Sequence, residues 1–150
     1  MRFRPCIDIH NGKVKQIVGG SLLDDKNQAE ENFVAVQDAG FYARLYRDSG
    51  IKGGHIILLN PAGSEYYEAD LEQARLALRE YPGGLQIGGG IHEGNAADFL
   101  NMGASHVIVT SYVFRDGTIR YDRLETLRKA VGKEHLVIDL SCRRRGDDYY

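Results

Sequence analysis

Two aspartates occupy matching apolar settings near opposite ends of the chain. Asp8 lies between two isoleucines, and Asp139 lies between an isoleucine and a leucine, each in a short run that predicts a buried strand. Burying a carboxylate without a partner is unfavourable, so each aspartate is best explained at a strand end that a ligand or water reaches. Two such carboxylates indicate an acid and a base.

A glycine run offers a place for an anion. Gly88, Gly89 and Gly90 join an apolar run to a helix that we expect to begin near Glu93. Residues without side chains let main-chain N–H groups approach an anion at the positive end of a helix. The spacing is neither that of a dinucleotide fingerprint nor that of a P-loop. Taken alone, the run is explained at least as well by a tight turn with close packing of helix and strand.

Two hydroxyl side chains, Thr110 and Ser111, close the next apolar run. In a parallel sheet the ends of adjacent strands lie side by side, so these hydroxyls are expected beside the glycine turn. Two neighbouring donors fit one phosphate. The alternative is that Thr110 and Ser111 only cap the following segment, as Ser and Thr commonly do.

Strand and helix patterns alternate along the chain. Apolar runs predict strands over residues 3–9, 55–59, 85–87, 106–110 and 136–140. Helical spacing and helix stop signals predict helices over residues 38–47, 69–81, 95–102 and 121–131. This alternation is typical of right-handed crossover units and predicts an α/β fold with a parallel sheet covered on both faces.

A tight turn follows the first predicted strand. Asn11-Gly12 is a strong turn signal, and residues 13–18 predict a strand that runs back along the first one. Residues 19–31 are a long polar segment, which in a compact domain is usually a lid or disordered, and we interpret it as a lid.

The composition excludes several classes of protein. The 150 residues carry 43% hydrophobic and 27% charged side chains and a net charge of −2, so a nucleic-acid partner is not expected. No stretch approaches the roughly 20 apolar residues of a membrane span, and we expect a cytoplasmic protein with no membrane partner.

The cysteines and histidines give no sign of a disulfide scaffold or a metal site. Cys6 and Cys142 are too few for such a scaffold and are interpreted as buried free thiols. His10, His92 and His106 lack the spacing of metal ligands, so we interpret them as surface or capping residues.

Five segments together resemble a family of histidine biosynthesis, the phosphoribosylformimino-5-aminoimidazole carboxamide ribotide isomerases, and most closely its eukaryotic-type branch. The resemblance extends over essentially the whole chain, and five motifs in the family's order are more specific than any one of them. The segments are PCIDIHNGKV (5–14), GHII (54–57), LQIGGGI (85–91), VIVTS (107–111) and VIDLSCR (137–143).

The resemblance implies a (βα)8 TIM barrel, of which this chain supplies about the first five strands. Residues 1–150 are then the N-terminal portion of a single barrel domain. It also implies an Amadori rearrangement of an aminoaldose to an aminoketose, on a ribonucleotide with a phosphate at each end, without cofactor or metal.

The resemblance also assigns roles to particular residues. Asp8 matches the general base that removes the proton from C2 of the sugar, and Asp139 matches the general acid that protonates the ring oxygen. His55 matches a histidine that helps to orient the substrate. The residues that match a phosphate grip are Gly89, Gly90, Thr110 and Ser111.

Barrel geometry makes these assignments consistent. Strands one and five of eight lie opposite each other, so their carboxyl ends place the two carboxylates across one mouth. The two roles require one carboxyl group to be ionised and the other protonated. In the loop after the fifth strand, Arg143 is the basic residue that we expect to reach a phosphate, the alternative being a solvated basic loop.

The chain departs from the family in two respects. Leu58 stands where bacterial members carry an aspartate, so we assign no carboxylate from the second strand. A complete barrel needs about 250 residues, whereas this chain stops soon after its fifth predicted strand and leaves the edges of strands one and five open. We expect the full-length form to be a monomer. If the 150 residues were the whole polypeptide, we expect them to be inactive and either to self-associate or to remain partly unfolded.

Two other functions stay open. One is the sister cyclase that makes imidazole glycerol phosphate, which shares the Pro-Cys-x-Asp start and the glycine run but depends on ammonia. The other is a non-catalytic, phosphate-binding half-barrel that serves as an interaction module. The endings of the fourth and fifth predicted strands favour the isomerase.

Overall fold

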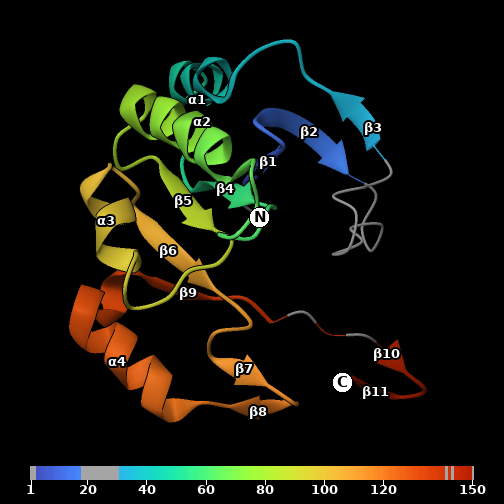
Figure 1. The fold of residues 1–150 in the computed structure, drawn as a ribbon, viewed down its shortest axis with the longest axis vertical. Coiled ribbons are helices and arrows are strands. Elements are labelled where there is room, and N and C mark those ends of the chain that lie inside the picture. Colours follow the sequence, from blue (N-terminus) through green and yellow to red (C-terminus); the bar gives the residue numbers. More distant parts are fainter. Residues whose placement is uncertain (1–2, 18–30, 141, 143, 150) are drawn as a thin grey trace.

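The computed structural model describes residues 3–17, 31–140, 142 and 144–149 and centres on a seven-stranded sheet (Figure 1). The order across the sheet is β3-β2-β1-β4-β5-β6-β9, and β1, β4, β5, β6 and β9 run parallel, as predicted. The bounds are β1 Cys6–His10, β2 Lys13–Ile17, β3 Glu31–Val34, β4 Gly54–Leu58, β5 Leu85–Gly88, β6 His106–Val109 and β9 Leu136–Ile138.

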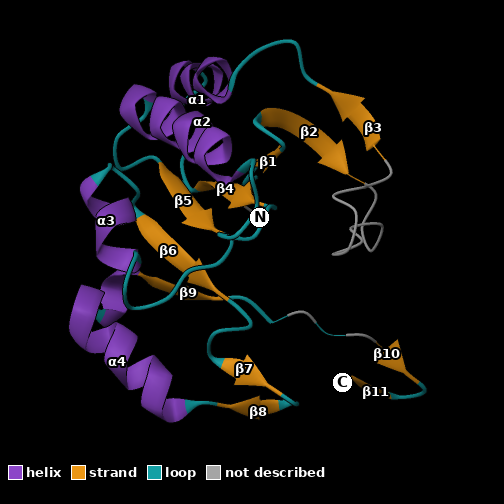
Figure 2. Ribbon diagram, in the orientation of Figure 1, coloured by secondary structure: helices purple, strands orange, loops and turns teal. Residues whose placement is uncertain are grey.

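Helices connect the parallel strands and lie together along one side of the sheet (Figure 2). They are α1 Ala39–Asp48, α2 Tyr67–Glu80, α3 Ala96–Asn101 and α4 Tyr121–Val131, and a short 3-10 turn spans Lys133–His135. Two small hairpins are formed by β7 Phe114–Arg115 with β8 Thr118–Ile119, and by β10 Arg144–Arg145 with β11 Asp148–Tyr149. The predicted alternation of strand and helix is confirmed. None of the described helices is long and apolar enough to cross a membrane.

The strands separate apolar from polar side chains because successive residues point to opposite faces. Ile7 and Ile9 of β1 are buried in the core, whereas Asp8 between them is only half-buried. The same alternation repeats in β4 and β6, whereas all four residues of β5 are buried. The core residues of these three strands are Ile56, Leu58, Leu85, Ile87, Val107 and Val109. Each such side chain contributes about 1.5–3 kcal/mol when it is fully buried. A shift by one residue would expose this set, so the pattern also determines which face carries Asp8.

The β1 edge is less open than predicted. β2 pairs antiparallel with β1 over three positions, with Asp8 opposite Lys15, and β3 then pairs with β2. Strand β3 was not predicted, because the long polar segment before it gave no strand signal. Of the segment predicted as a lid, residues 19–30 lie outside the described residues.

The predicted helix start near Glu93 is wrong, because α3 begins at Ala96. The Asn95 side chain accepts a hydrogen bond from the His92 N–H at 2.9 Å and donates one to the Gly90 carbonyl at 3.0 Å. These two bonds hold residues 90–95 in a turn. The glycine run therefore leads into a turn, and the helix that follows has only six residues.

Candidate active site

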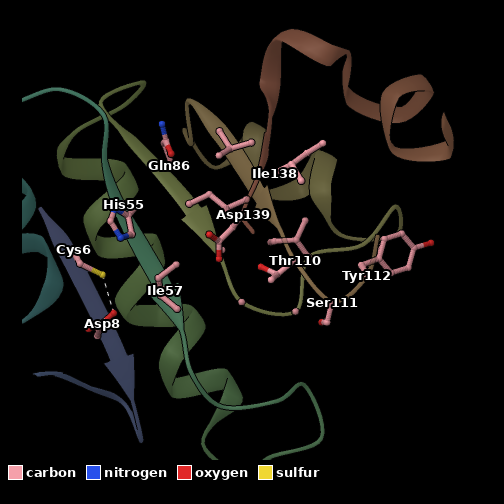
Figure 3. A pocket seen from close by; sticks show the side chains of 16 residues that line it. Cys6, Asp8, His55, Ile57, Gln86, Thr110, Ser111, Tyr112, Ile138 and Asp139 are labelled. Atoms are coloured by element: carbon pink, nitrogen blue, oxygen red, sulfur yellow. Dashed lines mark hydrogen bonds between the residues drawn. The ribbon is translucent and has the colours of Figure 1, made fainter. Parts of the chain in front are cut away.

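A cavity of about 600 Å³ lies on the sheet face that carries Asp8 (Figure 3). Its lining comes from all five parallel strands and from the segments that follow them. Of the sequence-predicted site residues, seven line this cavity: Asp8, His55, Gly89, Gly90, Thr110, Ser111 and Asp139. The eighth, Arg143, lies outside the described residues. Side chains separated by up to 131 positions thus share one cavity, as predicted.

The two aspartates approach the cavity from different sides and different depths. Figure 3 shows Asp8 on β1 at one side, with Asp139 beside Thr110 at the other. In the parallel register Asp8 is level with Ile57, and the same level continues through β5 and β6 to Val137 of β9. Asp139 lies two residues beyond Val137, where its N–H donates to the Val109 carbonyl at 3.0 Å. It is therefore one layer nearer the carboxyl ends of the strands than Asp8.

Cys6 contacts the Asp8 carboxylate directly. Its Sγ donates a hydrogen bond to Asp8 Oδ1 at 2.8 Å. Desolvation by the surrounding protein raises the pKa of the Cys6 thiol well above its ordinary value, and the bond to Asp8 and the charge of Asp8 raise it further. The prediction of buried thiols is wrong, because Cys6 and Cys142 are both exposed. Cys6 lies on the cavity face of β1, and it also lines a second cavity together with Tyr42 and Tyr46 of α1.

His55 lies one layer below Asp8, because it is level with Cys6 in the β1–β4 register. The next residue at this level is Gln86 of β5, which is buried and lines the same cavity. Gln86 was not predicted as a site residue. Its signal was a polar side chain between Leu85 and Ile87, at a position that alternation directs away from the core.

Two neighbouring glycines in the turn after β5 differ in the space around them. Gly89 has a φ of +101°, and a Cβ there would overlap the main chain of Leu58, so close packing excludes any other residue. Gly90 has a φ of +65°, but a Cβ there would meet no heavy atom within 4 Å. The tight-turn interpretation thus applies to Gly89, while Gly90 leaves open space in the cavity wall.

Tyr112 forms part of the cavity rim and was also missed. The Arg123 guanidinium of α4 lies 4.8 Å from the centre of its ring and donates to the Tyr112 carbonyl at 3.2 Å. A hydrogen bond to Glu93 raises the pKa of the Tyr112 hydroxyl, with desolvation as the next cause. These contacts tie the segment after β6 to the turn after β5. Nothing in the local sequence pattern marks Tyr112, since its partners come from elsewhere in the chain.

The prediction that His10 is a surface or capping residue is wrong, because it is 1% exposed. Its ring lies 3.5 Å from the Lys15 ammonium. His92 does act locally, since its ring accepts a hydrogen bond from the Gly94 N–H at 3.0 Å. Within the described residues, no three His, Cys, Asp or Glu side chains are grouped to hold a metal ion.

A buried polar cluster anchors the turn after β1. Asp70 of α2 is fully buried and accepts a hydrogen bond from the Gly12 N–H at 2.7 Å. The Asn60 side chain accepts from the Asn11 N–H at 2.8 Å and donates to the Asn11 side chain at 2.9 Å. Burial raises the pKa of Asp70, against the opposing effect of main-chain N–H groups and of the charges of His10 and Lys15.

Comparison with known proteins identifies a family and several relatives. A family model described as "Histidine biosynthesis protein" matches residues 2–149. A chloroplastic 1-(5-phosphoribosyl)-5-((5-phosphoribosylamino)methylideneamino) imidazole-4-carboxamide isomerase of Medicago truncatula is 50% identical over 155 residues, which cover 99% of this chain and 47% of the relative.

Two fungal isomerases of the same name are similar to the chain. That of Neurospora crassa is 47% identical over 149 residues, with 98% of this chain and 55% of the relative covered. That of Saccharomyces cerevisiae is 44% identical over 148 residues, with 97% of this chain and 54% of the relative covered. The chain spans about half the length of the curated relatives it matches.

Proposed function

The chain belongs to the histidine biosynthesis protein family, a family of TIM barrels, and from this membership we propose that the protein is an aldose–ketose isomerase. Its substrate is the phosphoribosyl-formimino-aminoimidazole-carboxamide ribonucleotide named for its relatives, and its product is the phosphoribulosyl form. The observation that carries the proposal is that Asp8 on β1 and Asp139 directly after β9 line one cavity, although these are the two outermost of the five parallel strands. Residues 1–150 then form the N-terminal portion of the barrel domain.

The proposed reaction needs one proton donor and one proton acceptor. Asp139, in its protonated form, donates a proton to the ring oxygen, and the bond from that oxygen to C1 breaks to leave a Schiff base with the amine. Asp8, in its ionised form, removes the proton from C2, so that a double bond forms between C1 and C2. A proton returned to C1 and one lost from the C2 hydroxyl complete the ketose. Atoms and electrons are thus conserved without a cofactor.

The glycine turn and the two hydroxyls support binding of one substrate phosphate. Gly90 leaves open space in the cavity wall, and Thr110 and Ser111 lie in the same wall. Hydroxyl and main-chain N–H donors both suit a phosphate oxygen. We propose that these groups hold one phosphate and that Arg143 contributes a positive charge. His55, one layer below Asp8, orients the sugar.

The names of the relatives favour the isomerase over the cyclase. The three relatives compared above are named as isomerases, and the proposed mechanism uses no ammonia. Turnover of the aminoaldose in ammonia-free buffer therefore distinguishes the two functions. A half-barrel that only binds phosphate would show no turnover in the full-length protein.

Substitution of either aspartate tests the mechanism. In the full-length protein, Asp8→Asn and Asp139→Asn are each expected to lower kcat by about 10²–10⁴-fold, because a positioned acid or base contributes that much. The measurement is conversion of the aminoaldose, followed by separation of substrate and product. Asp98→Asn, at an exposed position of α3, is the matched control and should retain full activity. Wild-type turnover by either site variant would contradict the assigned roles.

Location and assembly are further parts of the proposal. We propose a monomeric full-length enzyme in the cytoplasm, although the Medicago truncatula relative is named as chloroplastic. Cell fractionation and light scattering on the full-length protein test these two points separately.

A further inference from the structure

Cys6 and Asp8 act as a pair on one face of β1. They are two residues apart in a strand, so their side chains point the same way, and both line the cavity (Figure 3). The thiol donates to Asp8 Oδ1 at 2.8 Å. We propose that Cys6 is a positioning residue that holds one carboxylate oxygen of Asp8 and thereby directs the other toward the substrate. This inference rests on the proposed function, since it concerns how the base is oriented.

The surroundings of Cys6 keep its thiol a hydrogen-bond donor. Desolvation, the bond to Asp8 and the negative charge of Asp8 all raise the pKa of Cys6, so the sulfur stays protonated at neutral pH. A thiolate would repel the carboxylate and donate nothing. The same surroundings make Cys6 a poor nucleophile, because the thiolate is the reactive form. The site therefore suits a constant donor and not a reactive cysteine.

The backbone fixes the direction of this hydrogen bond. Asp8 is paired with β4 on one side and with β2 on the other, and Cys6 is paired with β4, so donor and acceptor are carried by one strand of the sheet. A base held in this way needs no reorganisation when the substrate binds. Ionisable side chains from several elements line the two cavities to which the pair belongs. They are Arg4 before β1, Lys15 of β2, Tyr42 and Tyr46 of α1, His55 of β4, Tyr112 after β6 and Asp139 after β9.

Two substitutions of Cys6 in the full-length protein separate positioning from packing. Cys6→Ala removes the donor and is expected to lower kcat by about 10- to 100-fold, as for loss of a hydrogen bond to a charged group. KM should change by less than about 2-fold, because the contact acts on proton transfer and not on binding. Cys6→Ser keeps a donor and should restore most of kcat. Asp98→Asn, at an exposed position of α3, should leave kcat unchanged.

A second measurement does not depend on activity. In a Cys142→Ala background of the full-length protein, alkylation of Cys6 by iodoacetamide is followed between pH 7 and 10, with and without Asp8→Asn. Removing the charge of Asp8 should lower the pKa of the thiol, so alkylation at a given pH should become about 10-fold faster. Circular dichroism checks that both proteins are folded.

The outcomes distinguish a failure of the role proposed for Cys6 from a failure of the proposed isomerase function. Wild-type kcat in Cys6→Ala, or no rescue by Cys6→Ser, overturns the role of Cys6 and leaves the isomerase standing. Alkylation that is insensitive to Asp8→Asn also overturns it. A wild-type protein that does not convert the aminoaldose overturns the proposed function, and with it the role of Cys6, even where the alkylation result supports the contact.

Discussion

Individual residues of the cavity are constrained by sterics as much as by chemistry. Asp8 faces the cavity because Ile7 and Ile9 on either side of it occupy the core, and Gly89 stands where any side chain would enter the main chain of Leu58. The roles of general base and general acid proposed for the two carboxylates depend on contacts with the substrate. The need for Gly89 is independent of any ligand, so it can be tested on stability alone.

Gly89→Ala is expected to lower the free energy of unfolding of the full-length protein by about 2–5 kcal/mol. Left-handed backbone costs a side chain about 1–2 kcal/mol, and overlap with a packed neighbour adds about 1–3 kcal/mol. Urea denaturation measures the change. The control is Gly117→Ala, which has a φ of +71° and open space around it, and which should cost only the backbone contribution. Equal losses in the two variants would refute the steric argument.

The elements are joined by a buried polar cluster as well as by the apolar core. Asp70 of α2 accepts a hydrogen bond from the Gly12 N–H, and Asn60 after β4 accepts one from the Asn11 N–H. The turn after β1 is therefore anchored to α2 and to the segment after β4. The turn joins Asp8 on β1 to β2. The contribution of Asp70 to the free energy of unfolding depends on pH, because burial raises the pKa of Asp70 above its ordinary value of 3.8.

Asp70→Asn should change how stability varies with pH. A carboxyl group whose pKa is raised by folding stabilises the folded state below pH 3.8, and this contribution is lost as the pH rises through the folded-state value. Asparagine keeps an acceptor for Gly12 and does not ionise. The free energy of unfolding of the variant relative to the wild type should therefore increase from pH 3.5 to 7, as measured by urea denaturation. Glu65→Gln, at an exposed site, is the control and should follow the wild type. Parallel curves for Asp70→Asn would contradict the expectation.

At the scale of the whole molecule, the described sheet ends in β3 on one side and in β9 on the other, and the β9 edge lies next to the cavity. Among the described residues, β9 has a neighbour only on its β6 side, and Ile138 and Leu140 near this edge are 44% and 63% exposed. Unpaired strand edges with apolar side chains favour association. In relatives about twice as long as this chain, the remaining length is available to cover such an edge.

The 150-residue chain expressed by itself is expected to be inactive and to form dimers or larger species, as measured by light scattering. Leu140→Lys should reduce this association, because a charge at a sheet edge disfavours pairing with another edge. Val36→Lys, at a position that is 97% exposed and away from β9, is the control. A compact monomer that converts the aminoaldose would show that this expectation is wrong.

The order of elements was predictable because it depends on local periodicity. The bounds of α4 agree with the prediction over residues 121–131, and the five parallel strands lie within a few residues of the predicted runs. The predicted site residues followed from strand ends and from the family resemblance. The bounds of α3 also agree with the helix predicted over residues 95–102, although not with the start near Glu93 expected from the glycine run. Strand β3 was not predictable in the same way, since pairing with β2 determines it.

The sequence by itself determined the α/β alternation, the polar residues at strand ends and the family. These properties depend on patterns among residues that are close together in the chain. Only the tertiary structure decided the layer difference between Asp8 and Asp139, the contact of Cys6 with Asp8, and the burial of His10 and Asp70. Each of these depends on strand register or on which segments cover a side chain. Such properties arise from pairing between distant residues, and a linear pattern does not contain them.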